Sequence, residues 1–167
     1  MYRTIADFEN AWQMETAGTL KVLRALTDES LAQPIATGYS TLGGLAWHVT
    51  GVLGGMLRQG GLEVEGPARG TPQPSSAAEI ADAYEASARS VVEAVRTAWT
   101  DESLAKLVPF FGREIPAGVM LSIAILHQTH HRGQMTVLMR QAGLRVPGLY
   151  GPSKEEHEAM LAAQASA

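Results

Sequence analysis

Apolar residues return every three or four positions along most of the chain, which is the period of helices that bury one face. This pattern predicts four long helices and a short fifth one. The long ones run from about Tyr2 to Leu26, from Ser40 or Thr41 to about Gln59, from Ser76 to about Trp99, and from about Ala117 to Gln141. Ser153 can cap the short helix at the end of the chain.

Capping residues and helix breakers support these boundaries. Ser76 is followed three residues later by Glu79, which is the spacing of a capping box. Residues 60–75 are rich in glycine and proline and predict a long irregular connection, which allows the next helix to be a non-adjacent neighbour. No segment has the pattern of a strand. The aromatic residues of the 106–116 loop are expected to close one end of the core.

The hexapeptide Thr-Asp-Glu-Ser-Leu-Ala occurs twice, at residues 27–32 and 100–105. Each copy follows a long helix and precedes a loop and then a helix that carries histidine. The first copy is expected to open a short turn at Thr27 or Asp28. The repetition favours a bundle of two similar helical hairpins, although chance or a shared preference for a capping turn would also produce six identical residues.

Composition narrows the class of protein. The 167 residues, of which 46% are hydrophobic and 18% charged, are expected to form a single domain over 1–167. A formal charge of -4 argues against nucleic acid as a partner. Acidic residues near the N-terminus and the lack of a long apolar run indicate a cytoplasmic protein without a membrane span. The chain has no cysteine, so any metal must be held by nitrogen and oxygen.

Three of the five histidines lie within residues 125–134. His127 and His131 are about one helical turn apart, and their face is expected to point inward, with its apolar residues packed in the core. Such a pair can supply two metal ligands, and a pair of hydrogen-bonded core histidines is the alternative. His130 could replace His131 as a ligand or pack at the helix edge. No glutamate follows His127, so the general base of the His-Glu-x-x-His zinc proteases is missing.

His48 is the best candidate for a third ligand, because His157 lies among glutamates and is expected to face solvent. The face of His48 also carries Gly44, Gly51 and Gly55, which indicate either a cavity beside the imidazole or the close approach of another helix. Three imidazoles would leave a position open for water, as catalytic metal sites do. Gln134, which lies two turns from His127, could orient a ligand, a water molecule or a substrate.

The segment His127-x-x-x-His131-Arg132-Gly133-Gln134, together with a histidine in the middle of the second helix, resembles the DinB/YfiT-like superfamily of metalloenzymes. Residues 146–152, followed by Glu155 and Glu156, also resemble the ends of its members. The resemblance implies an all-α four-helix bundle with an up-down-down-up path and a divalent metal, zinc, nickel or similar, held by His48, His127 and His131. It also implies homodimers and, in some relatives, a transferase or isomerase activity that uses a low-molecular-weight thiol.

Three functions follow from these patterns. The first is a metal-dependent enzyme, either a hydrolase or a thiol-dependent transferase acting on a small molecule, for which the thiol must come as a cosubstrate. The second is a metal-binding, stress-associated dimer without turnover. The third is a helical interaction module that binds no metal. The sequence identifies no catalytic residue, and Gln134 is a candidate only for orienting a ligand, a water molecule or a substrate.

Overall fold

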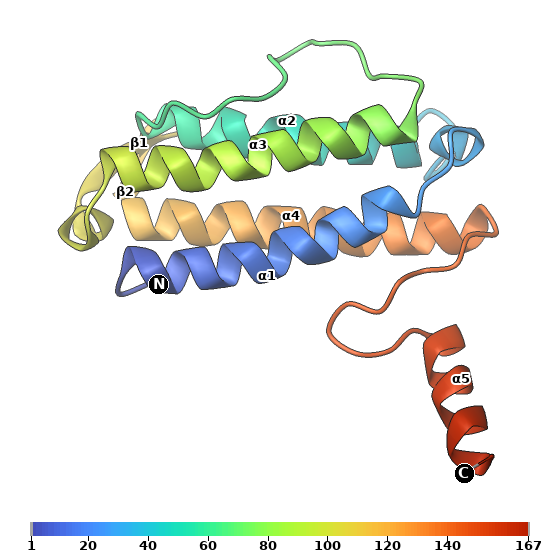
Figure 1. Cartoon of the computed structure of the whole chain (residues 1–167). Coiled ribbons are helices and arrows are strands. Elements are labelled where there is room, and N and C mark those ends of the chain that lie inside the picture. Colours follow the sequence, from blue (N-terminus) through green and yellow to red (C-terminus); the bar gives the residue numbers. More distant parts are fainter. Residues whose placement is uncertain (1, 167) are drawn as a thin grey trace.

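The computed structural model describes residues 2–166 and is built mainly from helices, with four long ones side by side in a bundle (Figure 1). They are α1 (Ile5–Arg24), α2 (Leu42–Gln59), α3 (Ala77–Ala98) and α4 (Ala117–Gln141). Helices α1 and α4 run in one direction and α2 and α3 in the other, so the path is up-down-down-up. The predicted all-α fold class is confirmed.

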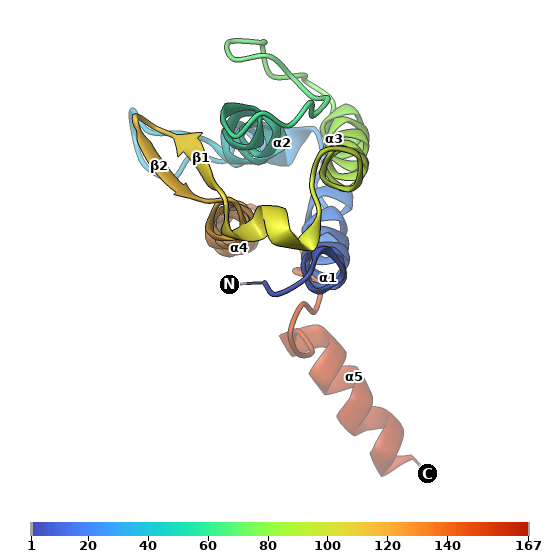
Figure 2. The same cartoon turned by 90° about the vertical axis from the view of Figure 1, so that its left-hand side faces the viewer.

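Seen along its axis, the bundle has α1 next to α3 and α4, while α2 lies diagonally across from α1 (Figure 2). The connection between α2 and α3 runs back along the length of the bundle (Figure 1), as the predicted long connection allows. Large apolar side chains from all four helices fill the centre, among them Phe8, Leu53, Ile80 and Leu121. Thr41 caps α2 by accepting a hydrogen bond of 3.1 Å from the backbone N–H of Gly44.

The two copies of the repeated hexapeptide adopt similar structures and make reciprocal contacts. Each forms a short 3-10 helix, η1 (Glu29–Ala32) and η2 (Asp101–Ala105). Asp28 accepts a hydrogen bond of 2.7 Å from the backbone N–H of Ala77, the first residue of α3. Asp101 accepts one of 2.7 Å from the N–H of Ile5, the first residue of α1. Each hairpin therefore caps the other, which supports the interpretation as two similar halves.

The expectation that the chain has no strand is wrong, because residues 107–116 form a small antiparallel hairpin. Strands β1 (Leu107–Phe110) and β2 (Arg113–Pro116) are joined by a two-residue turn. The turn residues Phe111 and Gly112 have φ values of 48° and 77°, as a type I′ turn requires. Phe110 is buried, but Phe111 is 65% exposed, so only one of the two aromatic residues closes the core.

The last helix, α5 (Lys154–Ala165), stands away from the bundle in both views (Figures 1 and 2). Ser153 caps it as predicted, through a capping box with Glu156. None of its residues is buried. Among the described residues, every helix is too short or too polar to cross a membrane.

Candidate metal centre

The structure brings His48, His127 and His131 together at the outer seam between α2 and α4. The Nε2 atom of His127 lies 3.1 Å from the Nε2 atom of His48 and 3.1 Å from that of His131. One nitrogen from each of the three rings lies within 4.8 Å of the other two. The antiparallel packing of α2 against α4 thus joins residues 79 positions apart in the sequence.

The expectation that His127 and His131 point into the core is wrong. His48 is exposed and the other two are half-buried, so the group lies at the surface. The core positions at this level of α4 are Gln128 and Arg132, which are 0% and 2% exposed. One residue along a helix turns the side chain by about 100°, and this offset moves the histidines to the edge of the buried face.

The glycines on the face of His48 leave open surface rather than a helix contact. A Cβ atom added at Gly55 would meet nothing within 4 Å. One added at Gly51 would approach only Pro67, at 3.8 Å, in the connection that follows α2. At Gly44 the nearest atoms belong to the neighbouring Ser40 and Thr41. Close packing of a helix therefore does not explain these residues, and the space beside His48 is open to solvent rather than enclosed.

Gln134 fixes the tautomer of His131. The Nδ1 atom of His131 lies 2.6 Å from Oε1 of Gln134. Because an amide oxygen can only accept a hydrogen bond, Nδ1 must carry the hydrogen and Nε2 keeps its lone pair. That lone pair lies on the side of His131 that faces His127, so Nε2 of His131 is free to act as a metal ligand there. Such an outer hydrogen bond is the usual support for a metal-binding imidazole.

The three imidazoles are neutral at pH 7. Burial lowers the pKa of His127, and the neighbouring His131 and His48 lower it further, to about 4. Burial and His131 lower the pKa of His48. Burial also lowers the pKa of His131, although the hydrogen bond to Gln134 partly offsets this effect. Neutral rings are the form that binds metal.

The remaining histidines lie outside the group. His130 is exposed, with its ring centroid 5.0 Å from that of His131. It is absent from the set of nitrogens that converge. His157 is exposed on α5, as expected from the glutamates around it. Position 128, where a zinc protease would carry its glutamate, is a glutamine that points into the core and accepts a hydrogen bond of 2.6 Å from the Tyr84 hydroxyl.

Sequence reasoning missed a buried polar network directly behind the histidines. The Arg132 guanidinium donates to the Glu15 carboxylate at 2.5 Å, to the Glu15 carbonyl at 2.7 Å and to Thr19 Oγ1 at 3.2 Å. It also donates to the Tyr150 hydroxyl, which in turn donates to Glu15 at 2.7 Å. The network joins α1, α4 and the segment after α4. One pattern in the sequence could have revealed this network. Arg132 has helical spacing with Gln128 and Ile125, which places it on the buried face of α4.

Comparisons with known proteins agree with this architecture. The model of the DinB family matches residues 1–165. An uncharacterized protein of Bacillus subtilis, YrdA, is 47% identical over 156 residues, which cover 93% of each chain. A DinB-like protein from Bacillus cereus has a crystal structure with a TM-score of 0.87 and 50% identity, covering 90% of this chain and 100% of that one.

A more distant structure shares the fold. The DinB-like protein YjoA of Bacillus subtilis is 16% identical, with a TM-score of 0.65, and the match covers 87% of this chain and 98% of that one. The family match over nearly the whole length and the identity to YrdA agree with each other. The chain belongs to the DinB family.

Proposed function

We propose that the protein binds a divalent metal ion, zinc, nickel or a similar one, through His48, His127 and His131. The observation that supports this proposal is the convergence of three Nε2 atoms. With metal–nitrogen bonds of about 2.05 Å, adjacent ligand atoms are about 3.3 Å apart in a tetrahedral site and about 2.9 Å apart in an octahedral one. The separations of 3.1 Å from His127 to His48 and to His131 lie between these values, so both of these donor pairs fit the ion.

We further propose that the site is catalytic and acts on a small molecule, as a hydrolase or as a transferase that uses a low-molecular-weight thiol. When bound, the ion supplies Lewis acidity toward water or a thiol. The chain provides three neutral imidazoles and leaves the solvent side beside His48 open to a substrate. Gln134 holds His131 in the binding tautomer. A thiol must come as a cosubstrate, because the chain has no cysteine.

A second candidate is a metal-binding, stress-associated dimer in which the ion only joins α2 to α4. The observation that favours it is the composition of the group. Among the described residues, no carboxylate belongs to the cluster of the three histidines. The group therefore contains no carboxylate that could act as general base, whereas an ion that ties two helices together needs none.

Elemental analysis of protein purified without a histidine tag tests the metal site. We expect about one equivalent of metal in the wild type and less than about a tenth in His127→Ala, because two imidazoles bind weakly. His130→Ala is the matched control and should keep its metal, since His130 lies outside the group. A wild type with less than about a tenth of an equivalent, unchanged in His127→Ala, would refute the site.

Turnover separates the two candidates. Metal-loaded protein is offered activated esters and amides, and small thiols with an electrophile. Loss of turnover in His48→Ala, with unchanged far-UV circular dichroism, would support the enzyme. No turnover by the metal-loaded wild type across the panel would favour the binding role.

A further inference from the structure

The two segments that carry the three clustered histidines are the longest stretches of the chain without a charged residue. They are residues 30–57 and 115–131, in a chain of which 18% is charged. Burial does not account for this lack of charge. On α3, charged residues occupy unburied positions along the helix from Glu79 to Arg96, whereas the unburied positions of α2 before Arg58 are all uncharged. The outer surface around the histidines is therefore uncharged although it meets solvent.

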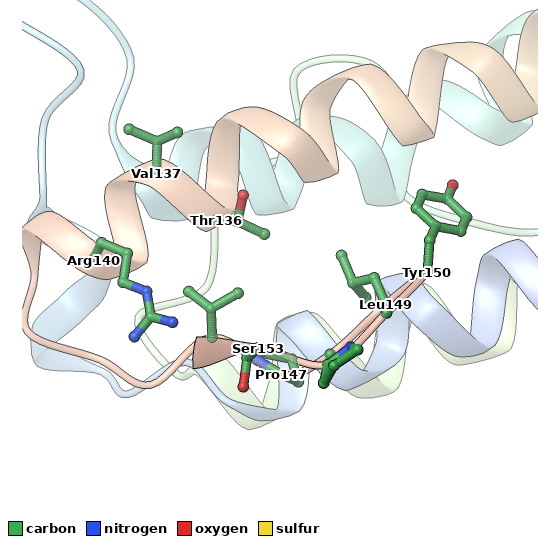
Figure 3. A pocket seen from close by; sticks show the side chains of 11 residues that line it. Thr136, Val137, Arg140, Pro147, Leu149, Tyr150 and Ser153 are labelled. Atoms are coloured by element: carbon green, nitrogen blue, oxygen red, sulfur yellow. The ribbon is translucent and has the colours of Figure 1, made fainter. Parts of the chain in front are cut away.

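The arginines of α2 and α4 are all held by other parts of the chain. Arg58 donates a hydrogen bond to a backbone carbonyl of the connection that leads to α3. Arg132 is buried in the network behind the histidines. Arg140 pairs with Glu155, and Figure 3 shows it facing residues 147–153 across a hollow of about 360 Å³. Within these two helices, which are described in full, no cation is left to pair with a carboxylate or a phosphate beside the histidines.

Toward the β-hairpin, the seam between α2 and α4 is apolar and open. Val52 follows His48 by one turn of α2 and is half-buried. A Cβ atom added at Gly55, the next position on this face, would meet nothing within 4 Å. Because α2 and α4 are antiparallel, the turn of α4 that lies opposite carries Ile123, one turn before His127 and also half-buried. Aliphatic side chains and bare backbone thus continue the surface away from the imidazoles.

Phe111 lies at the far end of this surface, in a conformation that is costly to the fold. Its φ of 48° is in the left-handed region that bulky residues rarely adopt, and its side chain is 65% exposed. Its backbone N–H donates a hydrogen bond of 2.8 Å to Oε1 of Gln59, the last residue of α2. Figure 2 shows the hairpin on the side of the bundle where α2 and α4 are neighbours. Asparagine or glycine would fit the turn without strain, so the fold does not explain an exposed phenylalanine here.

We propose that this seam binds a neutral substrate with an apolar body. The body lies over Gly55 and ends at Phe111, with the reacting group at the imidazoles. The helix from His48 to Gln59 is about 16 Å long, which suits an elongated molecule. A charged group would lose water here without gaining a partner. The inference rests on the proposed function for the reacting end alone, because the apolar body binds without metal.

Amide chemical shifts of nitrogen-15-labelled protein test the charge and the length of the bound molecule. The probes are 1-hexanol, hexanoate and hexylammonium, which share one chain length and differ in charge, and ethanol, which is shorter. We expect hexanol to bind at least about tenfold more tightly than each of the other three. Protein as purified and protein treated with a chelator should bind it equally. The resonances that shift should be those of Val52, Gly55, Ile123 and Phe111.

Gly55→Glu places a charge in the seam and keeps the helix, since glutamate is a better helix former than glycine. We expect hexanol to bind at least about tenfold more weakly and hexylammonium at least about tenfold more tightly. Gly133→Glu is the matched control. A Cβ atom added at Gly133 would also meet nothing within 4 Å, but this residue lies about 160° round α4 from His131. All affinities should therefore stay unchanged in the control.

Phe111→Asn separates a binding role from a structural one. Asn-Gly is the preferred sequence for a type I′ turn, so the free energy of unfolding in urea should rise. The affinity for hexanol should fall about three- to tenfold, because an aromatic contact is lost. A variant that is less stable and binds hexanol as the wild type does would show that Phe111 serves the fold, and would overturn the proposal.

Three further outcomes would overturn it: hexanol shifts that lie away from the seam, tighter binding of a charged probe, or a dimer that Gly55→Glu dissociates while hexanol fails to bind. The last of these would place a second copy of the chain on the seam. Failure of the proposed function is distinguishable from these results. A protein that holds no metal but binds hexanol at the seam would refute the metal site and leave this inference standing.

Discussion

The replacement Arg132→Met tests whether the buried network holds α1 against α4. The Arg132 and Glu15 side chains are 2% and 9% exposed, and their ion pair is 2.5 Å long. Removing one partner of a buried pair typically costs about 3–5 kcal/mol, because the other charge is left without compensation. For a domain of this size, such a loss corresponds to a fall in melting temperature of about 10 °C.

The pH dependence of this loss distinguishes a stranded charge from lost packing. Burial raises the pKa of the Glu15 carboxyl, but hydrogen bonds from Tyr150 and Arg132 outweigh it and hold the pKa below its ordinary value. In the wild type, Glu15 therefore contributes stability that is lost as the pH falls through this lowered pKa. In Arg132→Met, burial becomes the dominant effect on Glu15, and the pKa of its carboxyl in the folded state rises above 4.5. The variant then gains stability relative to the wild type as the pH falls from about 6 to 4.5.

Urea unfolding at pH 7.0 and 4.5 measures both effects, with metal removed by a chelator. The control Glu15→Leu/Arg132→Met removes both charges and should be more stable than Arg132→Met alone, because no buried charge is left unpaired. A loss below about 1 kcal/mol for Arg132→Met would refute the reasoning. So would a loss that does not shrink at pH 4.5.

The remaining two predictions concern the histidines. Gln134→Ala should weaken metal binding by about 10- to 100-fold in a competition assay with a chromogenic chelator, because His131 loses the partner that fixes its tautomer; an unchanged affinity would exclude this role. In metal-free protein, the pKa of His127 falls from 6.5 to about 4 on folding. Its contribution to stability is therefore present above pH 6.5 and is lost between about pH 6.5 and 4 as the unfolded chain takes up the proton. Between pH 7 and pH 5, His127 should contribute up to about 2 kcal/mol to the decrease in the free energy of unfolding. This contribution should be missing in His127→Ala, and an equal pH dependence in both proteins would contradict the prediction.

The sequence was sufficient for the helices because each has a strong local signal. Thr41 and Ser153 cap α2 and α5 at the predicted positions, and α4 has the predicted bounds. The hairpin at 107–116 was missed for a physical reason. Its strands have four residues each and include Pro109, so they carry neither a clear alternation nor strand propensity. What forms them is the turn at Phe111 and Gly112 and the packing of Phe110 on the core.

For the histidine group, too, the sequence predicted only part of the arrangement. Spacing along α4 was enough to select His127 and His131 over His130, since a turn of helix fixes which side chains share a face. It was not enough to say which face is buried, because residues 127–132 are all polar. That choice depends on partners from other helices: Glu15 for Arg132 and Tyr84 for Gln128. These bonds set the rotation of α4, and the rotation places the imidazoles at the seam with α2, where His48 meets them. The placement of the group therefore depends on a buried ion pair that spans 117 positions of sequence, which no local pattern can reveal.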